Sequence, residues 1–257
     1  MKSYDAYIFD LDGTVYLGDT LLPGAGQAIE LLRERGKRTV FLSNNPTHTR
    51  AGYAEKLTWL GLPTDAKEIV NSSAVMVDFL SREMPGARLF VCGEEPLRRE
   101  LTAAGFVLTE DASATDAVIA SFDRTFAFWK LQIAFDAIRA GARFFATNGD
   151  RFCPVPGGGE PDAGAIIGAI EGCTGTRVEA VVGKPSHFMS EAILSTVSTP
   201  PEQCIIIGDR LETDVLMGIQ AGMASALTLT GATTREMLER SEIQPTYVVE
   251  SLMDLIG

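Results

Sequence analysis

The sequence contains few of the residues on which several common kinds of site depend. Its 257 residues include only two histidines and four cysteines. No two cysteines form a CxxC pair, and none lies at zinc-like spacing from His48 or His187. A zinc site and a disulfide framework are therefore not expected. We interpret the cysteines as buried or semi-buried thiols in a reducing compartment, where each behaves as a small hydrophobe.

Long apolar runs and positive charge are also scarce. No run approaches the ~18 apolar residues of a membrane span, and the N-terminus lacks a basic stretch followed by an apolar one. The formal net charge is -12, which disfavours nucleic acid or an anionic membrane as a general partner. We expect a cytoplasmic protein. A small anionic substrate is still possible if a local cluster of cations or a metal binds it.

Short apolar runs alternate with helical patterns along most of the chain. Strands are predicted at residues 6–10, 38–44 and 204–209, and amphipathic helices at residues 24–36 and 187–197. This alternation argues for parallel sheets with helices on both faces. The predicted fold class is therefore α/β.

Turn-rich segments at residues 81–88 and 171–177 suggest domain boundaries. The residues between them have a strand-helix pattern of their own. We predict a core domain made of residues 1–80 and 180–257, and an inserted domain of residues 81–179.

Two further expectations concern the middle of the chain. Residues 153–165 are rich in proline and glycine and are expected to form the longest loop. Phe126, Phe128 and Trp129 are expected to pack in the core of the inserted domain.

Polar residues stand where the apolar runs end. The runs YIF, VFL, AVVG and IIIG are followed by Asp10, Ser43, Lys184 and Asp209, and Asp214 comes one helical turn later. In a parallel α/β sheet, ligands bind beyond the carboxyl ends of the strands. If the two ends of the chain form one sheet, these acids, the lysine and the hydroxyl meet at its edge.

The first of these runs ends in two acids. In an extended chain Asp10 and Asp12 face a common point, where they repel by roughly 3–4 kcal/mol at an effective dielectric near 20. A proton or a cation must relieve this repulsion, and with Asp209 added a hard cation such as Mg²⁺ fits best. Gly13 lets the chain turn, and Thr14 is expected to brace the turn by hydrogen bonding.

The other polar residues suit an anion that is bridged to the metal. Lys184 supplies positive charge, Ser43 and Asn44 supply neutral donors, and a helix beginning near Thr47 adds backbone N–H groups. A phosphoryl group is the natural candidate. One carboxylate can attack phosphorus, while a second protonates the leaving oxygen and later deprotonates water.

Four motifs occur in the order found in phosphatases of the haloacid dehalogenase (HAD) superfamily, which the sequence resembles. They are DLDGT at residues 10–14, LSNN at 42–45, GKP at 183–185 and GDRLETD at 208–214. TNGDRFCP at 147–154 and PDAGAI at 161–166 resemble the cap of the NagD-like, or 4-nitrophenylphosphatase, branch. The resemblance covers nearly the whole chain. It implies a Rossmann-like parallel-sheet core with an inserted α/β cap, and an Mg²⁺-dependent phosphatase acting on a small phosphorylated metabolite through an aspartyl phosphate.

Carried over residue by residue, the resemblance implies that Asp10 is the nucleophile and Asp12 the general acid/base. The implied metal ligands are Asp10, Asp12 (through its backbone carbonyl), Asp209 and Asp214. The implied phosphate- or substrate-binding residues are Ser43, Asn44, Asn45, Lys184, Arg210, Thr213, Asn148 and Asp150. Gly149 stands where proline is common in the family, so the surrounding loop is expected to be more mobile.

Several alternatives stay open. Asp214 could instead serve the start of a helix, and Asn148 and Asp150 could form an Asx-type turn. A receiver domain also combines clustered acids, a hydroxyl and a lysine, but it needs no acid at the position of Asp12 and is about half this size. A non-catalytic binding protein is the third class. Sugar phosphates, nucleotides, phosphoglycolate and pyridoxal phosphate all remain candidate substrates, and the sequence does not decide whether the caps form a homodimer.

Overall fold

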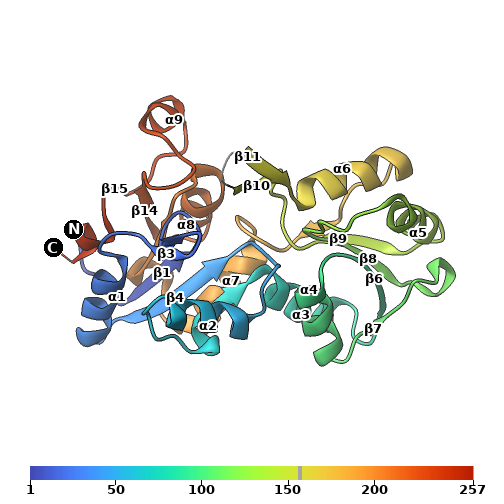
Figure 1. Cartoon of the computed structure of the whole chain (residues 1–257), viewed down its shortest axis with the longest axis horizontal. Coiled ribbons are helices and arrows are strands. Elements are labelled where there is room, and N and C mark those ends of the chain that lie inside the picture. Colours follow the sequence, from blue (N-terminus) through green and yellow to red (C-terminus); the bar gives the residue numbers. More distant parts are fainter. Residues whose placement is uncertain (156–157, 257) are drawn as a thin grey trace. The chain divides into compact units, whose positions relative to one another are not determined.

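The computed structural model describes residues 1–155 and 158–256. The chain forms two compact units, each drawn in Figure 1. The first unit comprises Met1–Ser43, Arg50–Val70 and Lys184–Gly257, and the second comprises Asn44–Thr49 and Asn71–Gly183. Each unit contains a parallel sheet with helices, which confirms the predicted α/β class.

The sheet of the first unit joins the two ends of the chain. Its strand order is β15-β14-β13-β1-β4-β5. The strands are β1 (Ala6–Asp10), β4 (Arg38–Ser43), β5 (Ile69–Asn71), β13 (Cys204–Gly208), β14 (Ala224–Thr228) and β15 (Tyr247–Val249). Because β1 pairs in parallel with both β4 and β13, their carboxyl ends meet at one edge, as the sequence predicted.

Helices cover both faces of this sheet. Ile205 and Ile207 of β13 belong to a core that includes Ile29 of α1. Ile206 points to the opposite face, where α8 comes so close that a Cβ on Gly218 would lie 2.7 Å from its side chain. The helices are α1 (Ala25–Glu34), α2 (Arg50–Trp59), α7 (His187–Val197), α8 (Leu216–Gln220) and α9 (Arg235–Arg240). Short elements are the hairpin β2 (Tyr16–Leu17) and β3 (Thr20–Leu21), and the helical turns η1 (Ala66–Glu68), η3 (Pro201–Gln203) and η5 (Leu252–Leu255).

The second unit has its own parallel sheet, in the order β12-β9-β8-β6-β7. Phe90, Val118 and Phe144 form one core with α5 and α6. The strands are β6 (Arg88–Cys92), β7 (Val107–Leu108), β8 (Ala117–Ala120), β9 (Arg143–Ala146) and β12 (Ala180–Val181). The helical elements are α3 (Ser72–Glu83), α4 (Glu95–Ala103), η2 (Ala112–Ala114), α5 (Phe128–Arg139) and α6 (Ala163–Thr174).

The division of the chain into units departs from the predicted boundaries at three places. Helix α3 was assigned in part to the core domain, but Phe79 of α3 packs edge-on against Phe145 of β9, with ring centroids 5.0 Å apart. Strand β12 was also assigned to the core domain, but it pairs with β9, so the second unit extends to Gly183. Residues 44–49 belong to the second unit as well.

Two local expectations were wrong. The predicted loop at residues 153–165 instead contains most of an antiparallel hairpin, β10 (Phe152–Val155) and β11 (Gly158–Pro161), followed by the start of α6. Residues 156 and 157 of that segment lie outside the described residues. Phe128 and Trp129 are 78% and 48% exposed, because α5 buries Lys130, Ala134, Ala137 and Ile138 instead.

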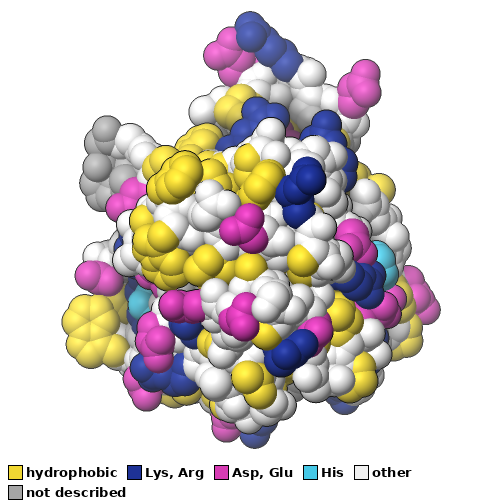
Figure 2. Space-filling view, turned by 90° about the vertical axis from the view of Figure 1, so that its right-hand side faces the viewer, with side chains coloured by type: hydrophobic (Ala, Val, Ile, Leu, Met, Phe, Trp, Pro, Cys, Tyr) yellow, Lys and Arg dark blue, Asp and Glu magenta, His cyan; other side chains and the backbone are white. Residues whose placement is uncertain are grey.

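The length and polarity of the helices, and the charge of the surface, concern two of the partners considered above, a membrane and nucleic acid. Within residues 1–155 and 158–256, each helix is too short or too polar to cross a membrane. On the face drawn in Figure 2, lysine and arginine side chains are interspersed with acidic ones over the surface.

Replacing Phe79 with alanine tests the assignment of α3 to the second unit. We expect Phe79→Ala to lower the opening free energy of the amides in β6, β8 and β9 by about 3–5 kcal/mol, because a buried aromatic ring is lost. Amides in β1 and β13 should be unaffected. Hydrogen exchange with mass spectrometry measures both, and Phe128→Ala, at an exposed position, is the control. Loss of protection in β1 and β13 instead would contradict the assignment.

Candidate active site

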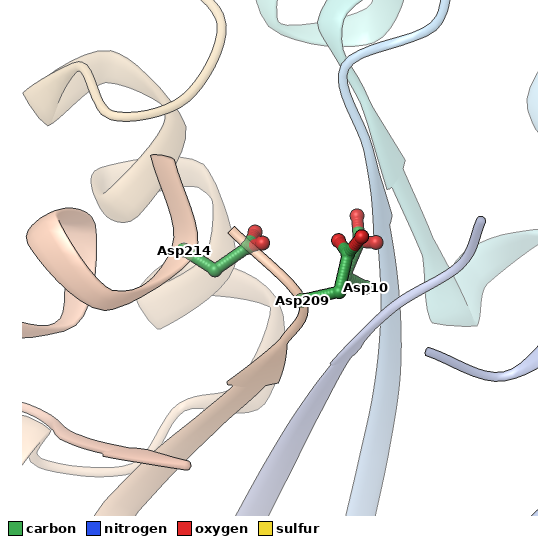
Figure 3. Close-up of side chains that lie close together, drawn as sticks. All are labelled: Asp10, Asp209 and Asp214. Atoms are coloured by element: carbon green, nitrogen blue, oxygen red, sulfur yellow. The ribbon is translucent and has the colours of Figure 1, made fainter. Parts of the chain in front are cut away.

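Three buried carboxylates converge at the carboxyl edge of the sheet in the first unit. Asp10 ends β1, Asp209 directly follows β13, and Asp214 lies in the π-helical turn η4 (Leu211–Val215). Each offers one ligand oxygen, and these oxygens lie within 4.8 Å of one another. In Figure 3 the carboxylates of Asp10 and Asp209 lie side by side, and that of Asp214 points toward them. The arrangement confirms that the two ends of the chain bring these acids together.

Lys184 lies within this cluster. Its Nζ donates to Oδ1 of Asp10 at 2.5 Å and to Oδ1 of Asp214 at 2.7 Å. Only 5% of the lysine side chain is exposed. With all groups ionised, one ammonium among three carboxylates leaves two negative charges, which one divalent cation would neutralise. Carboxylate oxygens are the donors that hard cations such as Mg²⁺ prefer, so the residues present fit a metal site.

The pKa values in the cluster reflect its burial. Burial raises the pKa of Asp10 well above its ordinary value, against the opposing effect of Lys184. Burial and the charge of Asp214 raise the pKa of Asp209 to about 6. Burial alone lowers the pKa of Lys184, but the charges of Asp10 and Asp214 outweigh burial and raise it, so the lysine stays an ammonium. A bound cation would favour the ionised carboxylates in the same way.

Local backbone geometry explains how Asp214 reaches the cluster. The N–H groups of Asp214 and Val215 both donate to the carbonyl of Arg210, which widens this turn into a π-helix. The Arg210 N–H in turn donates to Oδ2 of Asp214 at 3.1 Å. Gly208 leaves room for this carboxylate, because a Cβ there would overlap it. Asp214 therefore both serves the start of its own turn and pairs with Lys184.

Asp12 is not part of the buried cluster. Strand β1 ends at Asp10, and the N–H groups of residues 14–16 all turn back to the carbonyl of Leu11. Asp12 lies two residues beyond the end of β1, in an isolated β-bridge with Tyr16, and is exposed. Oδ2 of Asp12 accepts a hydrogen bond from the hydroxyl of Tyr16 at 3.3 Å, a partner that the sequence analysis missed.

Ser43 ends β4, Asn45 lies two residues further along the chain, and both side chains have hydrogen-bond partners. Ser43 is 3% exposed, and its Oγ lies 3.0 Å from the hydroxyl of Tyr53 in α2. Oδ1 of Asn45 accepts from the N–H of Thr47 at 2.9 Å, which orders the start of the next segment. Tyr53 was missed, because nothing in the helical pattern around it marks a hydroxyl partner.

In the second unit, Asn44 is tied to two of the residues predicted to bind substrate. Its Nδ2 donates to Oδ2 of Asp150 at 2.9 Å, and Ser72 Oγ donates to its carbonyl at 2.6 Å. Asn148 is fully buried and donates both to Oδ2 of Asp150 and to Oδ1 of Asp162. The structure thus brings Asn44, Asn148 and Asp150 together as one polar network, with Ser72 and Asp162 as members that the sequence analysis missed.

Two buried threonine hydroxyls have no hydrogen-bond partner among the described residues. One is Thr213 Oγ1, in the turn that carries Asp214. The other is Thr14 Oγ1, so the expectation that Thr14 braces its turn through the side chain was wrong, although its N–H does donate to the carbonyl of Leu11. Buried hydroxyls in native structures are normally satisfied, which makes Thr213 a candidate for a bound ligand.

Comparison with known proteins identifies the family. A family model described as haloacid dehalogenase-like hydrolase matches residues 7–107, and a second, HAD-hydrolase-like model matches residues 181–255. The chain is 40% identical to the sugar-phosphatase AraL of Bacillus subtilis, covering 96% of this chain and 90% of AraL. It is 35% identical to the chloroplastic phosphoglycolate phosphatase 1A of Arabidopsis thaliana, covering 100% of this chain and 78% of that protein.

The solved structures agree with this result. The 4-nitrophenylphosphatase of Thermotoga maritima matches with a TM-score of 0.94 and 36% identity, covering 98% of this chain and 96% of that one. The chain therefore belongs to the haloacid dehalogenase-like hydrolases. Within them it is a phosphatase of the NagD-like, or 4-nitrophenylphosphatase, branch, and so a phosphoric monoester hydrolase.

The raised pKa of Asp209 predicts how the stability of the metal-free protein depends on pH. Because the folded pKa is about 6 against an ordinary 3.8, the native state holds this proton more tightly than the unfolded state between those values. Stability should therefore fall as the pH rises from 4 to 6, by about 2–3 kcal/mol, and then level off. Urea unfolding in EDTA measures the fall.

The variant Asp209→Asn should lack this part of the fall, since its amide does not titrate. Asp19→Asn, at a side chain that is 82% exposed, is the control and should follow the wild type. Identical pH profiles for the wild type and Asp209→Asn would show that burial does not perturb this carboxyl.

Proposed function

We propose that this protein is an Mg²⁺-dependent phosphatase that hydrolyses sugar phosphates, or similar small phosphomonoesters, through an aspartyl phosphate. The observation that carries the proposal is the cluster of Asp10, Asp209 and Asp214 around Lys184. Membership of a phosphatase branch supports the reaction, and the name of the 40% identical AraL supports sugar phosphates as the substrate class. Family membership also sets aside the receiver-domain and binding-protein alternatives.

In the proposed reaction a carboxylate oxygen of Asp10 attacks phosphorus, and the bond to the leaving oxygen breaks. Asp12 gives its proton to that oxygen. Water then attacks the aspartyl phosphate, and Asp12 takes a proton from it, so that phosphate and free Asp10 are released. The exposure of Asp12 supports this role, because a shuttling acid must exchange protons with water. The hydroxyl of Tyr16 holds Asp12 in place.

The metal and Lys184 would neutralise the negative charge of the phosphoryl group. Asp10, Asp209 and Asp214 would hold Mg²⁺, together with the backbone carbonyl of Asp12. When bound, the ion supplies electrostatic stabilisation to the phosphoryl oxygens. Lys184 adds a fixed positive charge that already faces the nucleophile, 2.5 Å from its Oδ1.

The remaining predicted residues are assigned to the phosphate or the substrate. Ser43 and Lys184 bind the phosphate in this proposal, together with Asn44, Asn45, Arg210 and Thr213. Among the described residues, the buried hydroxyl of Thr213 has no hydrogen-bond partner, which supports the assignment of Thr213 to the phosphate or the substrate. Asn148 and Asp150 act through Asn44, because their side chains bond to each other and Asp150 accepts from the Asn44 amide.

The second unit, as the inserted cap, selects the leaving group in this proposal. We place the enzyme in the cytoplasm, where its free cysteines would stay reduced; Cys92 and Cys204 are buried and Cys153 is half-buried as expected, but Cys173 is exposed. The homodimer stays a prediction.

The first test is release of phosphate from 4-nitrophenyl phosphate, with Mg²⁺ or with EDTA, by the wild type and Asp10→Asn. We expect EDTA to abolish turnover and Asp10→Asn to lower kcat at least about 10³-fold, because the attacking oxygen is lost. The exposed control Asp19→Asn should match the wild type. Equal rates for the wild type and Asp10→Asn, with and without the metal, would refute the mechanism.

The second test concerns the substrate. Steady-state kcat/KM is compared across sugar phosphates, nucleoside monophosphates, phosphoglycolate and pyridoxal phosphate. We expect the best sugar phosphate to exceed the other classes by about tenfold or more, equivalent to about 1.4 kcal/mol of transition-state binding. A higher value for another class would leave the phosphatase reaction intact and overturn the sugar-phosphate assignment.

A further inference from the structure

We propose that residues 228–233, which begin at the last residue of β14, are a positioning element that fixes one oxygen of Asp209 and leaves the other for the divalent cation. This inference rests on the proposed function, since it concerns the same metal site. The segment carries no acidic or basic side chain, and none of its residues was predicted to take part. All of its contacts described here lie within the first unit.

Two backbone hydrogen bonds connect the segment to Asp209. The N–H of Ala232 donates to Oδ2 of Asp209 at 2.5 Å, and the N–H of Thr233 donates to the Asp209 carbonyl at 3.1 Å. Oδ2 thus faces a fixed donor. A charge-assisted bond of this kind also favours the ionised carboxylate, in which form Asp209 would bind a cation.

The backbone of two glycines lies close against the Asp209 carboxylate. A Cβ on Gly231 would overlap the carboxylate, and a Cβ on Gly13 would come within 2.7 Å of its Oδ2. The two glycines also face each other, because the same Cβ on Gly13 would lie 3.1 Å from the Cα of Gly231. The carboxylate therefore has little freedom to rotate.

The segment also binds the turn that follows the nucleophile. The hydroxyl of Thr230 donates to the carbonyl of Gly13 at 2.6 Å and lies 3.1 Å from Oγ1 of Thr228. One element therefore binds both the turn that follows Asp10 and the carboxylate of Asp209. Groups that orient a metal ligand in this way typically change metal affinity 10- to 100-fold when they are removed.

The variant Gly231→Ala tests the inference directly. The backbone of Gly231 is outside the left-handed region, so alanine is compatible with its φ, and the three atoms nearest to the added Cβ all belong to the Asp209 side chain. We expect the Kd for Mg²⁺ alone, measured by isothermal titration without substrate, to rise at least about tenfold. Gly172→Ala is the matched control, because an added Cβ there meets nothing within 4 Å.

A second pair of variants addresses the hydroxyl of Thr230. Thr230→Val removes the donor to Gly13 and should weaken Mg²⁺ binding, whereas Thr230→Ser keeps the donor and should restore it. This pair also decides the question if Gly231→Ala does not fold. The melting temperature of each variant in EDTA should change little, even where its affinity for Mg²⁺ falls.

Asp209→Ala and the wild type are titrated alongside, so that two failures can be told apart. If Asp209→Ala binds Mg²⁺ more weakly than the wild type, but Gly231→Ala and Thr230→Val bind it as tightly as the wild type, this inference is overturned and the phosphatase proposal stands. A wild type that binds no Mg²⁺ overturns both.

Discussion

The structure of the first unit depends on keeping three carboxylates out of water beside a single lysine. Taking an ion out of water costs several kcal/mol, and repulsion among the acids adds to that. Lys184 offsets part of this through its bonds to Asp10 and Asp214. The acids are also closely packed, and Gly208 provides the space that Asp214 needs. The remaining negative charge of the cluster must therefore be neutralised by another cation or by bound protons.

Much of this arrangement could be predicted from where apolar runs end. Strands β1 and β13 are buried runs that pair in parallel, although nearly two hundred residues separate them. The carboxyl ends of parallel neighbours meet, so the acids that follow them must lie close together. Chemistry then limited the ligand, because carboxylates around a lysine suit few partners other than a metal and an anion. For this reason the sequence predicted the part of the site that consists of charged residues at strand ends.

The rest depends on contacts that leave no pattern in the sequence. A strand as short as β12 carries no sign of which sheet it will join, and pairing with β9 decides this. Asp12 lies beyond the end of β1, where the N–H groups of residues 14–16 all donate to the carbonyl of Leu11, and alternation along a strand does not predict its hydrogen bond from Tyr16. Likewise, Asn44 meets Asp150 across a hundred residues, and backbone donors such as the N–H of Ala232 have no residue type that marks them.

The two ways in which the acids are stabilised differ in their effect on charge. Lys184 stabilises Asp10 and Asp214 by adding a positive charge to the cluster, whereas the N–H of Ala232 stabilises Asp209 without adding any. A second lysine or arginine at Asp209 would hold that carboxylate more strongly but would leave the cluster with a single negative charge. A neutral donor keeps two negative charges, which match a divalent cation. The use of a backbone donor rather than a basic side chain at Asp209 therefore preserves the negative charge that a divalent cation would neutralise.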